Sequence, residues 1–516
     1  MAKVLVVGGA GYVGSAVVAY LKDRGHEPWV LDDLSTGHSQ LILSEGFTHA
    51  QAGDTAVVKK LLSERKFDCV MHFAARSIVS ESVRKPDEYF ENNVVQTQRL
   101  IEAMLESGHP GHRRLIFSST CAVYGDPGVD RIDESCAKNP INPYGESKLA
   151  AEKMMERLAR DQGLQTVALR YFNASGGDPK QRVGEWHHPE THLLPNVIKA
   201  CLEGGEVQIF GTDYPTEDGT CIRDYIHVND LAAGHEAAML KLIKLEGTPQ
   251  ASRGRFEAYN LGSENGFSVR EVIEGCMLIT GLKPKVIEQP RRPGDPPILV
   301  ADSALAQKAL GFKIEHSFED IIRDAFEWKK KSVKTPAKAI FLDRDGTLNE
   351  DPGYLNDPDQ VKILPTVGEA LASLKRAGFH LIVVSNQSGI NRGFIQPEIL
   401  PKVNDRVNSY LRPSAGAIDE FICCVHKPEE DCACRKPKPG MLEAGRKMFN
   451  LDLSKCYMVG DKMSDIVVGN NAHVKASVLV RTGEGKKTEG ELKPGQAAFI
   501  ADSLLEAANW ILSQET

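Results

Sequence analysis

The chain has 516 residues, of which 41% are hydrophobic and 26% are charged, with 62 basic residues against 70 acidic ones. This length exceeds what one hydrophobic core supports, so we expect two or three domains. The net charge of −8 argues against nucleic acid and anionic membranes as partners, and no apolar run reaches the roughly 18 residues of a membrane span. The 11 cysteines, an odd number, favour reduced thiols, and no signal-peptide layout precedes the first strand. We therefore expect a cytoplasmic protein.

A glycine-rich turn follows the first expected strand, residues 3–7. Gly8, Gly11 and Gly14 form the pattern GxxGxxG, and a helix is expected directly after it at 15–24. Glycines at these positions let the backbone approach a pyrophosphate, which the amino-terminal end of a helix attracts. The turn therefore predicts a dinucleotide site.

Two acidic residues, Asp32 and Asp33, end the second expected strand at 28–31. An acidic side chain at this point accepts hydrogen bonds from the adenosine ribose and repels a 2′-phosphate, which favours NAD over NADP. A solvated aspartate in a turn is the alternative. Asp54 and Thr55 follow the third strand, where we expect them near the adenine.

Further strands are expected at 69–75 and 115–120, each alternating with a helix. This alternation predicts a doubly wound parallel sheet. Ligands of such sheets bind beyond the carboxyl ends of the strands. Small residues at Ala74 and Ala75 and a hydroxyl at Thr120 stand at those ends.

Tyr144 and Lys148 stand four apart in an expected helix, which places both on one face. A phenol has a pKa of about 10, and a nearby ammonium favours the phenolate and lowers that pKa. A tyrosine tuned in this way can take a proton from a sugar hydroxyl. Alone the spacing is common on helix surfaces, but here the glycine turn and the strand ends agree with it.

A second α/β unit begins after a basic linker at 331–337, which follows an expected helix at 318–330. Its first strand, 339–342, ends in Asp343 and Asp345. Of two carboxylates two apart, one can attack phosphorus while the other moves a proton. Their mutual repulsion calls for a cation such as Mg²⁺.

Later strands of this unit also end in polar residues. Ser385 and Asn386 follow the strand at 381–384, and Asp461 and Lys462 follow the one at 457–459. Arg435 and Lys436 add positive charge for a phosphoryl group.

Cys424, His426, Cys432 and Cys434 form a cluster just before Arg435. Three thiolates and one imidazole suit a closed tetrahedral Zn²⁺ site with a structural role. Reduced cysteines in a surface loop are the alternative.

Residues 1–330 resemble the extended short-chain dehydrogenase/reductase family and, within it, the UDP-glucose 4-epimerases. The matching stretches are 8–14, 72–75, 118–125, 142–148, 170–173, 210–220, 223–228 and 291–295. The resemblance implies Tyr144 as the base, Lys148 on the nicotinamide ribose and Thr120 on the sugar 4-hydroxyl. It implies further NAD contacts by Tyr12, Val13, Phe73, Ala74, Ala75, Asn92 and Tyr171, and UDP contacts by Asn173, Arg223, Arg292 and Asp295.

This resemblance implies interconversion of UDP-glucose and UDP-galactose through a 4-keto sugar, with NAD reused. Cys121 and Ala122 stand where related dehydratases carry an acidic pair, which argues against dehydration. Ser77 replaces a lysine that often contacts the cofactor, and Leu299 leaves acceptance of N-acetylated sugars open. A homodimer through this domain is compatible with the resemblance.

Residues 338–510 resemble the phosphatases of the haloacid dehalogenase (HAD) superfamily. This resemblance implies Asp343 as nucleophile, Asp345 as general acid/base, and Mg²⁺ on Asp343, Asp461 and the backbone carbonyl of Asp345. It implies that the sugar phosphate is held by Ser385, Asn386, Arg435, Lys436 and Lys462. The short gap between His426 and Cys432 resembles the histidinol-phosphate phosphatases, whereas Gly353, Tyr354 and the stretch 388–393 resemble the D-glycero-D-manno-heptose 1,7-bisphosphate phosphatases. We favour the heptose enzymes, with the histidinol-phosphate phosphatases as the alternative.

The sequence thus predicts a bifunctional α/β enzyme of sugar metabolism. Its first domain, 1–330, is an NAD-binding Rossmann domain with a small substrate-binding lobe, and its second, 338–516, is a HAD-like Rossmannoid domain. The competing hypothesis is that one half is a non-catalytic module that binds sugar nucleotides. The retained Tyr144, Lys148, Asp343, Asp345 and Asp461 argue against it, because binding alone needs neither a base nor a nucleophile.

Overall fold

The structure, a computed structural model, describes all residues except 188, 247, 249–252, 293–294 and 516. Pro293 and Gly294, which belong to the matching stretch at 291–295, thus lie outside the described residues. The chain divides into two units, one of residues 1–32 and 40–332 and the other of residues 33–39 and 333–516. Among the described residues, none of the helices has both the length and the apolar character needed to cross a membrane.

A seven-stranded parallel sheet forms the base of the first unit, in the order β10-β6-β5-β4-β1-β2-β3. Its strands, in chain order, are β1 (Lys3–Val7), β2 (Glu27–Asp32), β3 (Gly46–His49), β4 (Cys69–His72), β5 (Arg114–Thr120), β6 (Gln165–Tyr171) and β10 (Arg255–Leu261). Side chains alternate across the sheet, so that Val4 and Val6 pack into one core while Leu5 and Val7 pack into the other. The predicted doubly wound parallel sheet is confirmed.

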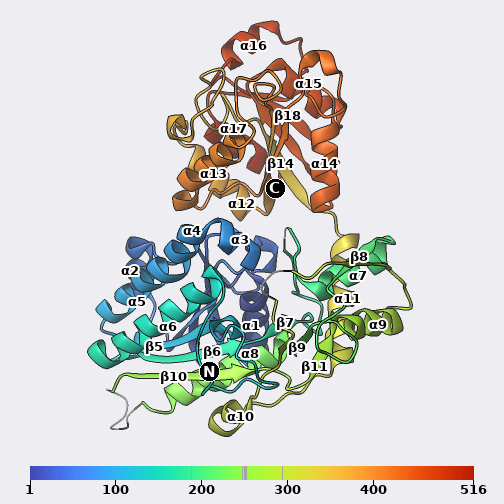
Figure 1. Cartoon of the computed structure of the whole chain (residues 1–516). Helices are drawn as coiled ribbons and strands as arrows, with labels where there is room; N and C mark the ends of the chain where they lie inside the picture. The colour runs from blue at the N-terminus through green and yellow to red at the C-terminus, as the bar shows by residue number, and fades with distance from the viewer. Residues whose placement is uncertain (188, 247, 249–252, 293–294, 516) are drawn as a thin grey trace. The chain divides into compact units, whose positions relative to one another are not determined.

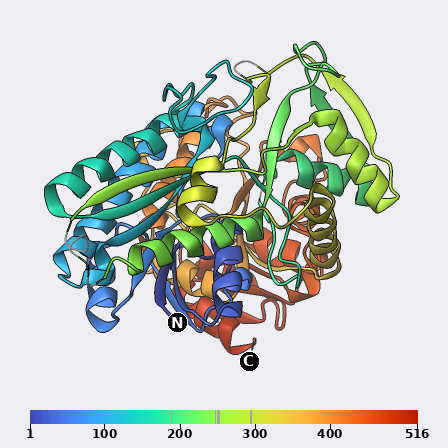
Figure 2. The same ribbon diagram turned by 90° about the horizontal axis from the view of Figure 1, so that it is seen from below.

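Helices cover both faces of this sheet. Helices α1 (Tyr12–Asp23) and α8 (Val228–Ile243) lie side by side on one face (Figures 1 and 2). The other face carries α2 (Thr55–Glu64), α5 (Gln96–Glu106) and α6 (Pro143–Gln162) (Figure 1). Shorter helical segments, α3 (Val79–Arg84), α4 (Pro86–Phe90) and the π-helical turn η2 (Glu91–Val95), connect β4 to α5.

A smaller lobe is built from later parts of the same unit. Strand β9 (Ile222–His227) pairs with β7 (Asn173–Ser175), β11 (Gly266–Ser268) and β13 (Ile298–Leu299), and β8 (Glu206–Phe210) pairs with β12 (Lys285–Gln289). Helices α7 (Leu193–Glu203), α9 (Val269–Thr280) and α11 (Phe318–Lys334) pack on these strands around their own apolar core. Helix α10 (Ala304–Leu310) instead packs with the core of α1 and α8.

The second unit is a six-stranded parallel sheet in the order β16-β15-β14-β17-β18-β19. Its strands are β14 (Lys338–Leu342), β15 (Phe379–Asn386), β16 (Glu420–Cys424), β17 (Tyr457–Gly460), β18 (Ala476–Val480) and β19 (Phe499–Ala501). Helices α12 (Val367–Arg376), α13 (Ile399–Leu411) and α17 (Leu504–Ser513) cover one face, and α14 (Gly440–Phe449) and α15 (Met463–Asn471) the other. Helix α16 (Gly485–Glu491) follows β18.

Several element bounds differ from the predicted ones. Helix α1 begins at Tyr12 instead of residue 15, because Gly11 takes the extended backbone of an N-cap. Strand β4 ends at His72, so Phe73, Ala74 and Ala75 follow the strand rather than end it. Helix α11 continues to Lys334, and the linker expected at 331–337 therefore begins as helix.

Candidate functional site

The glycine-rich turn packs so closely against the end of β4 that side chains are excluded. A Cβ atom on Gly8, whose φ is +83°, would lie 2.3 Å from the backbone nitrogen of Ala74, and one on Gly14 would lie 2.1 Å from the Gly8 carbonyl oxygen. The amides of Phe73 and Ala74 both donate to the carbonyl of Val7, at 2.7 and 3.1 Å. Backbone without side chains before a helix is what a pyrophosphate requires.

The acidic end of β2 is tied to this turn. The buried carboxylate of Asp32 accepts a hydrogen bond from the Ala10 amide at 2.9 Å. Asp33 accepts one from the Ser35 amide at 2.9 Å. The predicted Asp32 therefore lies at the turn, fixed by the same backbone that would face a dinucleotide.

Other predicted cofactor residues have structural contacts of their own. Asp54 caps α2 by accepting from the Val57 amide at 3.1 Å, and the neighbouring Thr55 hydroxyl donates to Gly53 at 3.4 Å. The Tyr12 hydroxyl donates to the Gly176 carbonyl at 2.8 Å, which joins α1, at its first turn next to Val13, to the segment after β7.

Asn92 lies in the π-helical turn before α5. Its amide donates to the Asn93 side chain at 3.0 Å, and Asn93 in turn donates to the Ser147 hydroxyl at 3.0 Å. Because Ser147 stands one residue before Lys148, this chain of contacts connects the π-helical turn to the predicted catalytic helix.

Tyr144 and Lys148 both lie in the first two turns of α6, as the spacing predicts. Asn142 caps this helix by accepting from the Gly145 amide at 2.9 Å, and Pro143 occupies its first turn. The side chain of Thr120, the last residue of β5, lies close enough to the Tyr144 phenol to lower its pKa against the effect of burial. The structure thus brings the predicted base and the predicted sugar-contacting hydroxyl together.

Without a bound ligand, Lys148 does not lower the pKa of Tyr144, and the predicted acidification of this phenol is therefore wrong for the protein by itself. The Lys148 ammonium donates to the Ser118 carbonyl at 2.7 Å and lies 4.7 Å from the centre of the Phe117 ring. Burial raises the pKa of Tyr144 to about 12, although the nearby Thr120 side chain opposes this rise. Burial also lowers the pKa of Lys148 to about 7, against the opposing charge of Glu152. Burial of the site was not visible in the spacing.

Below α6 lies a buried charge network that the sequence analysis missed. Glu152 accepts hydrogen bonds from Arg170 at 2.6 and 2.9 Å and from the Ser119 hydroxyl at 2.6 Å. Arg170 also donates to the Tyr124 hydroxyl at 2.9 Å, which itself donates to Asn260 at 2.8 Å. The network fixes the strand ends around the site. Its only sequence signal is an acid four residues after Lys148.

On β6, Tyr171 has its hydroxyl in a short contact with the Ser118 hydroxyl. Its ring and that of Phe73 both lie against the buried His235, with the Phe73 and His235 centroids 4.8 Å apart. These aromatic residues therefore line the carboxyl ends of β4, β5 and β6.

The predicted UDP-binding residues lie in the small lobe. The Asn173 amide donates to the Asp224 carbonyl at 3.0 Å. Arg223 lies 3.9 Å from the carboxylate of Asp295, and the Arg292 guanidinium lies 3.8 Å from the centre of the Phe210 ring. Two guanidinium groups here suit the doubly charged pyrophosphate of a sugar nucleotide.

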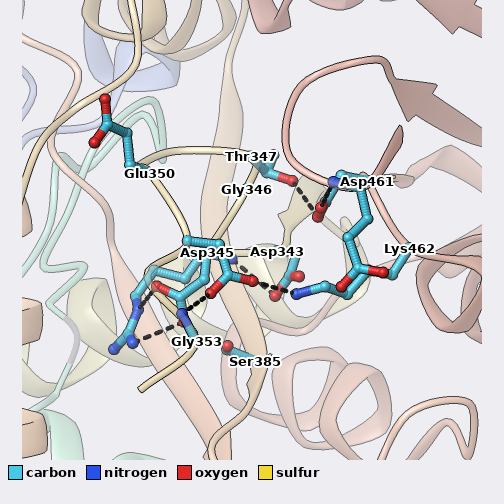
Figure 3. A network of polar contacts seen from close by, with 12 residues as sticks. Asp343, Asp345, Gly346, Thr347, Glu350, Gly353, Ser385, Asp461 and Lys462 are labelled. Atoms are coloured by element: carbon cyan, nitrogen blue, oxygen red, sulfur yellow. Dashed lines mark hydrogen bonds and ion pairs between the residues drawn. The ribbon is translucent and has the colours of Figure 1, made fainter. Parts of the chain in front are cut away.

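In the second unit, three buried carboxylates converge at the carboxyl ends of β14 and β17. Oxygens of Asp343, Asp461 and Asp465 all lie within 4.8 Å of one another. The Lys436 ammonium lies 2.9 Å from Asp343 and 2.7 Å from Asp465. Figure 3 shows Asp343 and Asp461 on facing segments. Asp465, which the predicted site omits, follows Asp461 by one helical turn.

This carboxylate cluster fits a magnesium ion. Burial and the charge of Asp343 raise the pKa of Asp461 to about 7, which reflects negative charges crowded together. An all-oxygen donor set is the one that Mg²⁺ prefers. A Cβ atom on Gly346, whose φ is +89°, would lie 2.3 Å from Asp461, so only glycine fits beside it.

The carboxylate of Asp345 takes no part in the cluster, and the magnesium contact predicted for this residue is one made by its backbone carbonyl. It accepts hydrogen bonds from Arg344 at 3.0 and 2.8 Å, from Asn349 at 2.9 Å and from Gln387 at 2.8 Å. Burial alone would raise the pKa of Asp345, but the Arg344 charge and the hydrogen bonds from Arg344, Asn349 and Gln387 together outweigh it, and the net shift is downward.

Of the remaining residues predicted to contact phosphate, two contact other side chains and two contact the protein backbone. Ser385 is buried at the end of β15 and accepts from Gln387 at 2.9 Å, and Lys462 donates to Asp351 at 2.9 Å. Asn386 instead holds the Lys436 backbone, accepting from its amide at 3.0 Å and donating to its carbonyl at 3.1 Å. Arg435 donates to the His426 carbonyl at 3.2 Å.

The four predicted zinc ligands converge. Cys434 Sγ lies 3.3 Å from Cys424 Sγ, 3.4 Å from Cys432 Sγ and 3.3 Å from His426 Nδ1. All four ligand atoms lie within 4.8 Å of one another, and all three cysteines are free thiols. Ligands of a tetrahedral zinc with Zn–S bonds of about 2.3 Å stand about 3.8 Å apart, so this donor set fits Zn²⁺.

The comparisons with known proteins agree with this geometry. Residues 4–262 match the NAD dependent epimerase/dehydratase family. The chain belongs to this family. A UDP-glucose 4-epimerase of Halalkalibacterium halodurans is 46% identical over 330 residues, which cover 64% of this chain and 96% of that protein. One of Rhizobium meliloti is 40% identical over 64% of this chain and 97% of that protein.

Solved structures of epimerases match about the same share of the chain as these relatives do. The UDP-glucose 4-epimerase of Brucella ovis in complex with NAD has a TM-score of 0.60 and 43% identity, covering 63% of this chain and 98% of that one. The UDP-Glc/GlcNAc 4-epimerase of Campylobacter jejuni has a TM-score of 0.55 and 37% identity, covering 64% of this chain and 100% of that one. Residues 433–507 match a family described as HAD-hydrolase-like, so the second unit contains a HAD-like α/β domain.

Proposed function

We propose that the first unit binds NAD and interconverts UDP-glucose and UDP-galactose. The observation that supports this best is that Thr120, at the end of β5, lies close enough to the buried Tyr144 phenol to affect its pKa, at the carboxyl edge of the same sheet in which β1 leads into the glycine turn. The Asp32 carboxylate at that turn favours NAD over NADP. The curated relatives with the UDP-glucose 4-epimerase name match nearly their whole length.

In this proposal Tyr144 takes the proton of the sugar 4-hydroxyl while Thr120 holds the same oxygen. NAD, when bound, would accept the hydride from sugar C4, return it to the other face, and bring a positive charge close to the phenol. That added charge matters, because Tyr144 with its protein neighbours has a pKa of about 12, so its phenol stays protonated at neutral pH and cannot accept the proton of the sugar. Arg223 and Arg292 would hold the pyrophosphate.

The test uses the full chain with UDP-glucose as substrate. Wild type should form UDP-galactose, and Tyr144→Phe should lower kcat at least 100-fold while retaining NAD, measured by absorbance of the released cofactor. Tyr20→Phe, on α1, is the matched control and should keep the wild-type rate. Full activity in Tyr144→Phe would refute the assignment of the base.

We propose that the second unit is a Mg²⁺-dependent phosphatase in which Asp343 is the nucleophile. The supporting observation is the junction of Asp343, Asp461 and Asp465 with the Lys436 ammonium in one buried cluster. Magnesium, when bound, would neutralise the phosphoryl oxygens. Asp343 would attack phosphorus, Lys436 would bind the transferred group, and Asp345 would give and take the leaving-group proton.

For this unit we favour a heptose 1,7-bisphosphate cleaved at the 7-phosphate, with histidinol phosphate as the second candidate. Phosphate release from both compounds, and from a panel of sugar phosphates, decides between them. Asp343→Asn should abolish release without changing epimerisation, and Asp359→Asn, in an exposed turn, is the control. Equal release from Asp343→Asn and wild type would contradict the proposal.

We further propose that Cys424, His426, Cys432 and Cys434 bind a structural zinc ion that fixes the loop carrying Arg435 and Lys436. Purified full chain should carry about one zinc per chain at this site. Serine in place of Cys432 and Cys434 should remove it. We also propose a cytoplasmic location. A further proposal is a homodimer formed through the first unit, and light scattering of the purified chain tests this dimer directly.

A further inference from the structure

A second cluster of metal-ligating side chains lies in the first unit, in the segment before helix α7. Glu185, His187, Glu190 and His192 supply two imidazole nitrogens and two carboxylates, and their ligand atoms all lie within 4.8 Å of one another. None of the four belongs to the cofactor, substrate or catalytic residues proposed above.

The separations within this cluster bracket those expected around a single ion. Nδ1 of His192 lies 2.5 Å from Glu185 Oε1 and 3.4 Å from Glu190 Oε1. Nδ1 of His187 lies 3.2 Å from Glu185 Oε1 and 3.9 Å from Glu190 Oε2. Nitrogen and oxygen ligands at about 2.0–2.1 Å from a tetrahedral Zn²⁺ stand about 3.3 Å apart. The observed distances fall on both sides of this value.

The ligands are also held in place by other contacts. The Glu185 side chain is only 6% exposed, and the backbone carbonyl of Glu185 accepts a hydrogen bond from the Trp328 indole at 3.2 Å. Glu190 Oε1 accepts from the amides of Thr191 and His192 at 2.8 and 2.9 Å. The His187 ring lies edge-on to the Tyr12 ring, with centroids 6.2 Å apart. A preorganised donor set of this kind loses little conformational entropy when an ion binds.

We propose that Glu185, His187, Glu190 and His192 bind one divalent transition-metal ion, with Zn²⁺ as the expected occupant. Two carboxylates balance the charge of the ion when both imidazoles are neutral. Imidazole nitrogens favour zinc, cobalt and nickel over magnesium and calcium, which prefer all-oxygen sites. In the metal-free protein, imidazole–carboxylate hydrogen bonds and ion pairs hold the same four side chains together.

The role of this ion is structural. Its ligands lie between Tyr12, in the first turn of α1 after the glycine turn, and Trp328 of α11, and they precede α7 directly. An ion here therefore fixes the start of α7 relative to the helix that follows the dinucleotide turn. We expect its removal to lower the melting temperature of the first unit rather than to abolish the reaction.

The experiment uses full-length protein with Cys432→Ser and Cys434→Ser, so that thiolate sites do not contribute. After chelation and dialysis, Co²⁺ is titrated in the presence of excess Mg²⁺, which occupies all-oxygen sites. We expect visible d–d absorption bands, without sulfur-to-cobalt charge transfer, that saturate at about one equivalent, and zinc should displace the cobalt.

Two ligand variants and one control complete this test. His187→Asn and Glu185→Gln should each weaken cobalt binding at least tenfold, whereas Glu203→Gln, exposed on the neighbouring α7, should bind like the parent. Circular dichroism verifies that each variant is folded, and a variant that is not folded is replaced by Glu190→Gln. Bands that fail to appear, that do not saturate, or that persist unchanged in folded ligand variants would overturn the proposal.

Discussion

The charge pair of Glu152 and Arg170 is buried under helix α6, and Glu152→Gln removes one charge while keeping the shape of the side chain. The two side chains are 3% and 2% exposed. Glu152 receives two hydrogen bonds from Arg170 and one from Ser119. In the variant an NH₂ group replaces one acceptor oxygen of residue 152 and faces one of its former hydrogen-bond donors. The Arg170 guanidinium therefore stays charged but loses its carboxylate partner.

Breaking a buried ion pair by neutralising one partner costs about 3–5 kcal/mol, because the other charge remains buried. For a unit of this size, each kcal/mol lowers the melting temperature by roughly 2–3 °C. We therefore expect the first unit to melt roughly 6–15 °C lower in Glu152→Gln than in wild type. The same change removes the carboxylate that opposes the lowered pKa of Lys148, so epimerisation should also weaken at neutral pH.

The assay is calorimetry of the full chain, in which the second unit serves as an internal reference. Glu156→Gln is the matched control, because Glu156 is exposed one turn further along α6. A double variant, Glu152→Gln with Arg170→Met, should recover part of the loss, since no unpaired guanidinium remains. If Glu152→Gln and Glu156→Gln melt within about 1 °C of each other, the reasoning about this pair is refuted.

Two further predictions concern the second unit. Gly346→Ala should lower phosphate release at least tenfold while leaving epimerisation unchanged, because its Cβ would lie 2.3 Å from Asp461; Gly490→Ala, where nothing lies within 4 Å, is the control. Burial alone would raise the pKa of Glu515, but hydrogen bonds from two lysines and a tyrosine lower it to about 2. Stability from this carboxylate is present above the unfolded pKa of about 4.3 and is lost as the pH falls toward 2. The melting difference between wild type and Glu515→Gln should therefore be constant from pH 8 to 5 and shrink below about pH 4.3; a difference independent of pH would contradict this.

Local patterns in the sequence were enough to predict the glycine turn, the acid at the end of β2 and the helix that carries Tyr144. Each depends on residues close together in the chain, where backbone geometry limits the outcomes. The sheet of the second unit and the meeting of Asp343 and Asp461 were also predictable, although these residues are far apart in the chain, because the carboxyl ends of parallel strands meet at one edge.

The parts that could not be predicted depend on pairing between distant segments. Arg170 on β6 pairs with Glu152 on α6, 18 residues earlier, and Lys436 reaches Asp465 from a loop 29 residues earlier. The Asp345 carboxylate turns to its own neighbour Arg344, although the alternation of side chains places it near Asp343. Spacing specifies neither these partners nor the burial that raises the pKa of Tyr144.

Lys148 and Lys436 show how surroundings give one residue type opposite properties. Lys148 is buried against a backbone carbonyl and an aromatic ring, so burial dominates and its pKa falls to about 7. Lys436 is equally buried, but Asp343 and Asp465 more than compensate for its desolvation, so its pKa rises. The second unit therefore keeps a positive charge beside its carboxylate cluster. In the reaction proposed for the first unit, Tyr144 would need added positive charge from a bound ligand before it could accept a proton, so we expect proton transfer to depend on bound NAD.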